Sequence, residues 1–182
     1  MKKDFGKKTF LFPMPVLIIG TYNLDGSANA MNAAWGGISE ETRISICVDD
    51  GHKTAKNVVN IGAFTVSIAD AENVVACDCV GIVSGNKEPD KMKKAVFNVT
   101  KSEFVNAPVI NELPMAVECN LLKFNEDGIC IGEIVNVSAD ESVLGDDGKI
   151  DPQKVEAITF DPILNAYIKL GEKVGNAFSD GK

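Results

Sequence analysis

The stretch PMAVECNLLKFNEDGICIGEIVNVSAD, residues 114–140, contains two long segments rich in Val, Ile and Leu. They are joined at NEDG (125–128), and an Asp-Gly pair between two apolar segments is a typical signal of a β-hairpin. Residues 114–140 therefore predict two long antiparallel strands, and the weaker signals in the rest of the chain are interpreted around them.

Shorter strand signals precede this hairpin. PVLIIGTYN (15–23) ends at a Leu-Asp-Gly turn and is followed by a second segment, which predicts another hairpin. RISICV (43–48) and AFTVSIA (63–69) alternate apolar and polar residues, so we expect two strands that each bury one face. Turns at GDDGK (145–149) and FDP (160–162) divide the C-terminal part into short pieces.

Two segments favour short helices. In DDGHKTAKNVVNIG (49–62), we expect Thr54 to cap a helix that Gly62 ends. NVVACDCVGI (73–82) is compatible with a helix or a strand, and its position between an Ala-Asp turn and the loop SGNKEPDK (84–91) favours a short helix.

Taken together, these elements predict a mainly β fold with short helices. Many short strands and frequent Asp-Gly turns are typical of an antiparallel barrel. The chain has 182 residues, of which 45% are hydrophobic, which is enough to bury one core. We therefore expect a single domain over residues 1–182.

The charge balance excludes several kinds of partner. Lys and Arg number 18 against 26 Asp and Glu, and a net charge of −8 would be repelled by a nucleic-acid backbone or an anionic membrane. No apolar segment reaches the roughly 20 residues needed to span a bilayer. Residues 1–10 lack the apolar stretch of a signal peptide, so we expect no nucleic acid, no membrane and no secretion.

The cysteines favour a cytoplasmic location. There are five of them, and CDC (77–79) lacks the spacing of a redox or zinc CxxC pair. We therefore expect them to be reduced and mainly buried. His52 is the only histidine, and no second cluster of ligands accompanies it, so no metal site is predicted.

The stretch NAMNAAWGG (29–37) is unusual for a strand, because Asn and small residues surround the only Trp of the chain. A strand built from Asn32, Ala33 and Ala34 would leave its main chain open to a flat heteroaromatic ligand. In the alternative interpretation, Ala33 and Ala34 pack under a helix while Trp35 fills the core.

Two short segments carry the chemistry of an anion site. Lys53 and Thr54 lie where the chain should enter a helix, so an ammonium, a hydroxyl and free N–H groups would converge there. Ser84 and Lys91 add a second hydroxyl and ammonium in a loop that would close over a phosphate. The alternatives are an ordinary capped helix and a plain surface loop.

Other chemistries find no support in the sequence. No GxGxxG follows a strand, no P-loop motif occurs, and no nucleophile can be paired with His52 as its base. Catalytic residues therefore remain unassigned. Any redox chemistry must come from a bound cofactor.

Seven segments share their order and spacing with a known family. They are PMPVLIIGTYNLDGSANAMNAAWGG (13–37), HKTAKNV (52–58), FTVSIAD (64–70), GIVSGNKEPDK (81–91), APVINELPMAVEC (107–119), GEIVNVSADE (132–141) and YIKLGEKVGNAF (167–178). Together they resemble the flavin reductase-like family with the FMN-binding split barrel, particularly its flavoredoxin-like branch. The resemblance spans almost the whole chain.

This resemblance implies a Greek-key split β-barrel that forms a homodimer and holds FMN in a groove near the subunit interface. It implies that the strand at Asn32, Ala33, Ala34 and Trp35 lies along the isoalloxazine ring and gives it main-chain hydrogen bonds. Small side chains there would admit the ring.

The resemblance also implies a site for the FMN phosphate. Lys53 and Thr54 match the family's phosphate-contacting turn, with Asn57 one helical step further on. Ser84 and Lys91 match a second anion-contacting loop. Related reductases often have arginine near this turn, whereas this chain has Lys53. Lysine binds phosphate as a point charge and holds it less rigidly than arginine does.

Three functions remain open at this point. As an enzyme, the protein would take hydride from NAD(P)H onto FMN and pass the electrons to an acceptor. As a non-enzymatic electron carrier, it would keep FMN bound and exchange electrons with a redox protein, and its acidic charge suits a basic partner. As a barrel without flavin, it would leave the two lysine segments without a role.

Overall fold

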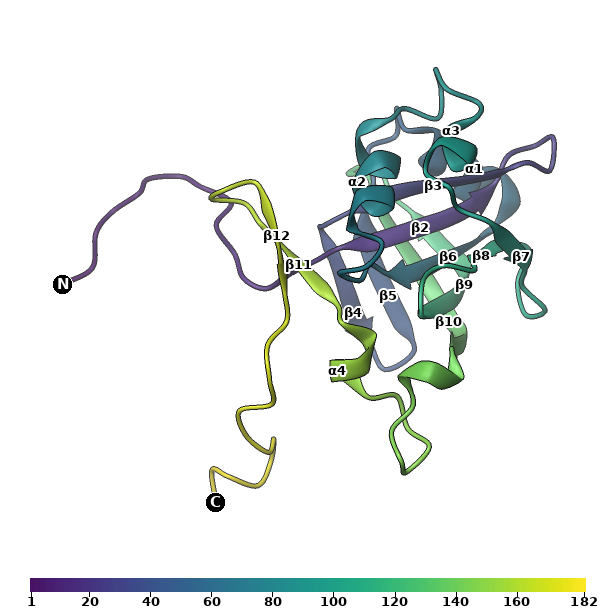
Figure 1. Ribbon diagram of the computed structural model, residues 1–182. Helices are drawn as coiled ribbons and strands as arrows, with labels where there is room; N and C mark the ends of the chain where they lie inside the picture. Colours follow the sequence, from purple (N-terminus) through teal and green to yellow (C-terminus); the bar gives the residue numbers. More distant parts are fainter.

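The computed structural model describes residues 1–182, and its main feature is a curled, seven-stranded antiparallel sheet in the order β3-β2-β6-β9-β10-β5-β4 (Figure 1). The strands of this sheet are β2 (Leu17–Tyr22), β3 (Ala28–Ala33), β4 (Gly36–Glu40), β5 (Arg43–Cys47), β6 (Ala63–Ile68), β9 (Met115–Phe124) and β10 (Ile129–Ala139). The expected mainly β architecture of split-barrel type is confirmed.

The two predicted hairpins are both present. β9 and β10 pair along their length, with Met115 opposite Ala139 at one end and Phe124 opposite Cys130 at the other. The turn between them places Gly128 at a φ of 74°. That left-handed conformation is one that glycine adopts without strain. β2 and β3 pair in the same way across the Leu-Asp-Gly turn. Local turn chemistry thus determined both hairpins.

The helices lie beside the sheet. They are α1 (Lys53–Ile61), α2 (Val74–Ile82), α3 (Lys91–Lys94), α4 (Pro152–Val155) and the 3-10 turn η1 (Glu141–Val143). The short helix expected over residues 73–82 is confirmed as α2, and Gly62 ends α1 in the left-handed conformation, as predicted. None of these helices has the length and apolar character needed to cross a bilayer.

The predicted cap of α1 is wrong. The helix begins two residues earlier than expected, with His52 in an extended conformation at the N-cap and no side chain bonded to the first turn. Thr54 lies inside the helix and is buried, so its hydroxyl contacts the sheet instead of the helix end.

Strand β6 lies at the centre of the sheet and is buried on both faces. Phe64 and Val66 point into a core cluster formed by the strands and α1, as the alternation predicts. The expectation of one exposed face is wrong, because Thr65 and Ser67 on the other face are also buried. The Thr65 hydroxyl donates to the Pro108 carbonyl at 2.6 Å, which satisfies it beneath the small sheet of β7 (Val99–Lys101) and β8 (Pro108–Ile110).

A second core cluster lies between the sheet and α2. It contains Ile18, Ala30, Cys77, Val80 and Ile110, all at most 1% exposed. The side chains of β2 therefore pack on both faces, since Leu17 and Ile19 belong to the first cluster. This second core holds α2 against β3, which positions the end of α2 for the site described below.

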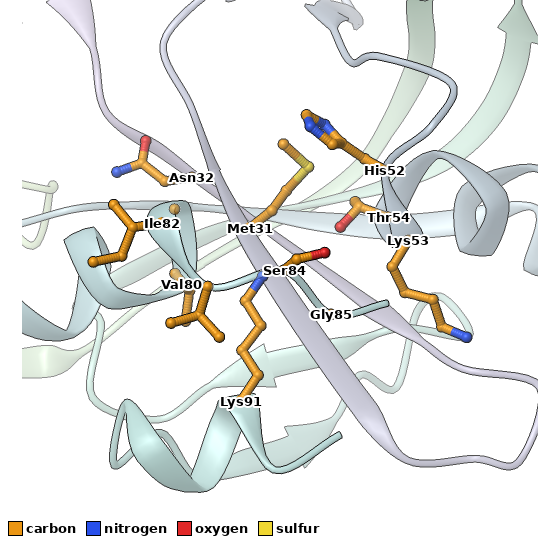
Figure 2. A pocket seen from close by; sticks show the side chains of 12 residues that line it. Met31, Asn32, His52, Lys53, Thr54, Val80, Ile82, Ser84, Gly85 and Lys91 are labelled. Atoms are coloured by element: carbon orange, nitrogen blue, oxygen red, sulfur yellow. The ribbon is translucent and has the colours of Figure 1, made fainter. Parts of the chain in front are cut away.

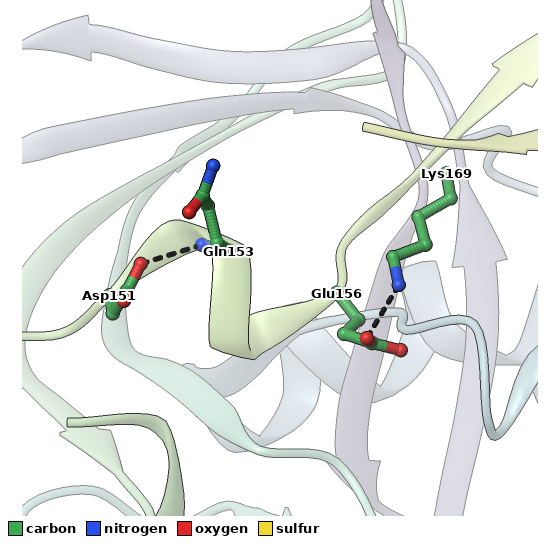
Figure 3. A network of polar contacts seen from close by, with 4 residues as sticks. All are labelled: Asp151, Gln153, Glu156 and Lys169. Carbon is green, nitrogen blue, oxygen red and sulfur yellow. Dashed lines mark hydrogen bonds and ion pairs between the residues drawn. The ribbon is translucent and has the colours of Figure 1, made fainter. Parts of the chain in front are cut away.

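A three-stranded sheet of β1 (Met14–Pro15), β11 (Ile158–Asp161) and β12 (Ala166–Lys169) projects from the barrel together with both chain termini (Figure 1). The β11–β12 hairpin is named the C-terminal arm below. Asp151 caps α4 by accepting from the Gln153 N–H at 2.9 Å, and Lys169 pairs with Glu156 (Figure 3). The ion pair is half exposed, so it stabilises the arm only weakly.

Candidate functional site

A pocket of about 240 Å³ opens between β3, the start of α1, the end of α2 with its following loop, and α3 (Figure 2). Five of the nine residues predicted from the sequence line it: Asn32, Lys53, Thr54, Ser84 and Lys91. Lys53 and Lys91, which are 38 positions apart in the chain (91 − 53), therefore line the same pocket.

Lys91 is the most unusual group in this pocket. Only 5% of the residue is exposed, and it has no hydrogen bond or ion pair within the protein. Figure 2 shows its side chain rising from α3 in the direction of Ser84, and both residues line the pocket. Burial lowers the pKa of Lys91 to about 8, although the nearby Cys79 acts in the opposite direction. An anion bound here would relieve the cost of burying this charge.

The start of α1 contributes the other side of the pocket. No side chain caps the helix and its first turn contains no acidic residue, so its free N–H groups and partial positive charge remain available to an anion. The Thr54 hydroxyl accepts from Asn29 Nδ2 at 2.9 Å, which ties α1 to β3. Thr54 therefore also holds the helix start in position.

Lys53 is placed differently from Lys91. It is only partly buried, and in Figure 2 its ammonium points away from that of Lys91. Hydrogen bonds from Ser27 lower the pKa of Asp25, and the Lys53 charge adds to this effect, so Lys53 also acts on the β2–β3 turn. Its contribution to the pocket is that of a partly exposed charge at the rim.

Two glycines allow the segment around the end of α2 to approach β3 and α1. A Cβ on Gly85 would lie 2.4 Å from Asn29 Oδ1 and 3.3 Å from Lys53 Cβ, and a Cβ on Gly81 would lie 3.0 Å from Asn32 Cβ. Any larger residue at position 85 would push the loop away from the sheet. The pocket thus depends on close backbone approach at Gly85.

The stretch expected to lie along a ring is only partly a strand. β3 ends at Ala33, whose side chain is buried in the first core cluster, and Ala34 follows the end of the strand. Trp35 lies in the bend before β4 and is 59% exposed, so the alternative in which it fills the core is wrong. These three residues do not line the pocket of about 240 Å³, whereas Asn32 and Met31 do.

Asn57 also lies outside the pocket wall. It is buried in α1, and its amide donates to Thr21 Oγ1 at 3.1 Å and to Asn23 Oδ1 at 2.9 Å. These contacts join α1 to β2 and to the turn that follows it. In this structure Asn57 therefore supports the helix that carries Lys53 and Thr54.

Sequence reasoning missed several residues of the site. Asn29 is buried against Thr54 and Gly85, and its unusual occurrence in a buried strand was the only signal for it. Tyr167 of the C-terminal arm contacts Asn32 across 135 positions of sequence, and no local pattern indicates such a contact.

The cysteines are mainly buried, as expected, and all five are free. Cys77, Cys119 and Cys130 are buried, and burial raises the pKa of each thiol to about 12. Cys79 is half-buried, and Cys47 is exposed at the end of β5. The buried thiols remain protonated at neutral pH and behave as small apolar side chains.

Comparison with known proteins is consistent with this geometry. Residues 9–154 match the family described as flavin reductase like domain. The flavoredoxin of Desulfovibrio vulgaris (Miyazaki F) is similar over 100% of both chains, with 38% identity and a TM-score of 0.96. A flavoredoxin from Methanosarcina acetivorans is 28% identical over 100% of this chain and 98% of that one, with a TM-score of 0.89.

A protein of Aeropyrum pernix is 28% identical over 120 residues. The similar stretch covers 65% of this chain and 45% of the length of that relative. The similarity therefore covers less than half the length of the Aeropyrum pernix protein.

Proposed function

Since this chain belongs to the flavin reductase like domain family, we propose that it is an FMN-binding oxidoreductase that moves electrons from NAD(P)H or a reduced partner through FMN to an acceptor. The observation that carries the proposal is the largely buried side chain of Lys91, whose ammonium has no partner within the protein, in a pocket that also contains the uncapped start of α1. A phosphate there would gain a charge-assisted contact and the helix N–H groups together.

The residues of the pocket fit a flavin phosphate. Lys91 and Ser84 would hold its oxygens from one side, and the N–H groups of α1 with Lys53 and Thr54 would hold them from the other. The main chain of β3 near Asn32 would lie along the ring, and Met31 would supply an apolar contact. Bound FMN supplies the electron-transfer chemistry, which no side chain of this chain offers.

A non-enzymatic electron carrier is the second candidate. Two similar solved proteins bear the name flavoredoxin, and the net charge of −8 suits electrostatic attraction of a basic redox protein. The five free cysteines favour a cytoplasmic location for either function.

One experiment separates the two candidates. We expect the purified protein, after incubation with FMN and removal of free flavin, to show the flavin absorption band, because the phosphate fills the Lys91 site. Anaerobic addition of NADH or NADPH should then bleach the band if the protein is a reductase. Persistence of the band with both nucleotides, followed by bleaching with a reduced redox protein, would identify a carrier.

The same preparation tests which flavin is bound. We expect FMN in preference to FAD, because the four pocket residues Lys53, Thr54, Ser84 and Lys91 suit a terminal phosphate. Acid release followed by chromatography against both standards measures the ratio. Recovery of FAD alone contradicts the FMN assignment, and protein that binds neither flavin contradicts the proposed function as a whole.

We also propose that the protein is a homodimer whose second subunit completes the flavin groove. Large apolar side chains are uncovered on β4 and the adjoining bend and in the C-terminal tail, where Ile38 is 68% exposed, Trp35 59%, Leu170 48% and Phe178 95%. A surface of this kind on a soluble chain is stabilised when a partner covers it.

Light scattering at low protein concentration should therefore give twice the chain mass of 19.4 kDa. The variant Ile38→Glu is expected to shift the equilibrium to monomer and to weaken FMN binding with it. Val59→Glu, which changes a similarly exposed residue on α1, serves as the matched control and should leave the dimer intact. A wild-type monomer that retains FMN contradicts the prediction.

A further inference from the structure

The C-terminal arm places one aromatic residue against the wall of the pocket. Tyr167 on β12 packs beside Phe160 on β11, with ring centroids 6.1 Å apart. Its hydroxyl donates to Asp78 Oδ1 at 2.7 Å and accepts from Asn32 Nδ2 at 3.5 Å. Three parts of the chain that are far apart in sequence, β3, α2 and the arm, thus meet at this hydroxyl.

These contacts determine how the Asn32 amide is oriented. Its nitrogen donates to the Cys77 carbonyl at 3.3 Å as well as to the Tyr167 hydroxyl. A flipped amide would place its oxygen against the Cys77 carbonyl, where two acceptors repel each other. Because the Tyr167 proton is committed to the Asp78 carboxylate, the Tyr167 oxygen acts as an acceptor towards Asn32.

The protonation state of Tyr167 agrees with this assignment. Burial, together with the neighbouring Asp78, raises the pKa of Tyr167 to about 12, so the hydroxyl keeps its proton throughout the neutral range. The Asn32 oxygen, in contrast, accepts no hydrogen bond within the protein, although the residue lines the pocket. Figure 2 shows the oxygen and nitrogen of this amide turned to different sides.

We propose that Tyr167 is a positioning residue, which holds the Asn32 amide so that its oxygen is presented to an N–H group of the ligand ring. The inference rests on the proposed function, since the oxidised isoalloxazine ring has one N–H group, at N3. The hydroxyl of Tyr167 then acts on flavin through Asn32 without touching it.

A consequence is that the C-terminal arm and the pocket are coupled. If docking of Tyr167 improves flavin binding, bound flavin must favour the docked arm by the same free energy. Flavin binding would therefore stabilise the docked position of the arm.

The test uses Tyr167→Phe, which removes the hydroxyl and keeps the ring that packs beside Phe160. FMN affinity should fall about three- to tenfold, the effect of one neutral hydrogen bond. A flavin methylated at N3 lacks the ring N–H, so its affinity should be the same for wild type and variant. Tyr22→Phe is the matched control, because it removes the hydroxyl of the chain's other tyrosine, which has no contact with Asn32.

A double-mutant cycle with Asn32→Ala supplies the second readout. If Tyr167 acts through Asn32, the loss caused by Tyr167→Phe should disappear in the Asn32→Ala background. Thermal unfolding of each apoprotein checks that the fold is retained.

Equal losses for FMN and the N3-methylated flavin, or losses that add in the double mutant, overturn the positioning role and leave Tyr167 as a structural clamp. Failure of the proposed function would look different, because wild-type protein would then bind neither flavin.

Discussion

Replacement of Lys91 by methionine is expected to lower FMN affinity about ten- to hundredfold. Methionine fills a similar volume but removes the charge-assisted contact to the phosphate, which contributes about 1.5–3 kcal/mol. The loss should be large because the Lys91 side chain is largely buried and its ammonium has no partner within the protein, so no other group of the protein competes for it. Fluorescence titration of apoprotein with FMN measures the effect.

Riboflavin and Lys53 provide the controls for this prediction. Riboflavin lacks the phosphate, so its affinity should be nearly the same for wild type and Lys91→Met. Lys53→Met removes a charge from the rim of the same pocket and should cost less than Lys91→Met, because Lys53 is less buried and points away from Lys91 (Figure 2). Equal losses for FMN and riboflavin, or a larger loss for Lys53→Met, would show that the phosphate lies elsewhere.

The pH dependence of the apoprotein follows from the same lysine. The pKa of Lys91 falls from 10.5 to about 8 on folding, so between these values the unfolded chain binds more protons than the folded one. The free energy of unfolding should therefore rise between about pH 8 and 10.5, and the full cost of the buried charge applies below pH 8. Lys91→Met should stabilise the apoprotein at pH 7 by roughly 1–2 kcal/mol, a value reduced because water reaches the pocket.

FMN binding should show the opposite trend. A bound phosphate favours the ammonium form of Lys91, so wild-type affinity should decline as the pH rises above about 8. Lys91→Met should lack this decline, and riboflavin binding should lack it in both proteins. A decline of the same size in the variant would assign it to a different group.

Gly132→Ala is expected to lower the free energy of unfolding by about 1–3 kcal/mol. A Cβ at this position of β10 would lie 2.4 Å from Phe64 Cζ and 3.1 Å from Cys119 Cβ. Phe64 is completely buried in the first core cluster, so the side chains packed around it oppose any shift of its ring. The strand or the ring must shift, and urea denaturation measures the cost.

Gly37→Ala is the matched control for this change. It places the same methyl group on β4 of the same sheet, where no atom lies within 4 Å, so stability should change by less than about 0.5 kcal/mol. Phe64→Leu should make room for the new methyl group, so the double variant with Gly132→Ala should be less destabilised than the sum of the two. Additive losses would refute the steric explanation.

Local signals in the sequence determined the hairpins, the end of α1 and the short helix α2. An Asp-Gly pair permits the tight turn at Gly128, and Gly62 adopts the left-handed conformation that ends a helix, and both effects involve only neighbouring residues. The same holds for the presence of two lysine segments with anion-binding chemistry. The lysine and hydroxyl residues of these two segments can be identified from the sequence alone.

The tertiary structure alone decided which of these residues share a site. Burial depends on what packs over a residue, so the sequence did not reveal that β6 is covered on both faces or that Trp35 is exposed. Lys91 becomes an unpaired buried charge only because α3 packs against α2 and β3. Tyr167 meets Asn32 only because the C-terminal arm returns to the sheet across 135 positions, a distance at which a periodic pattern contains no information about contacts.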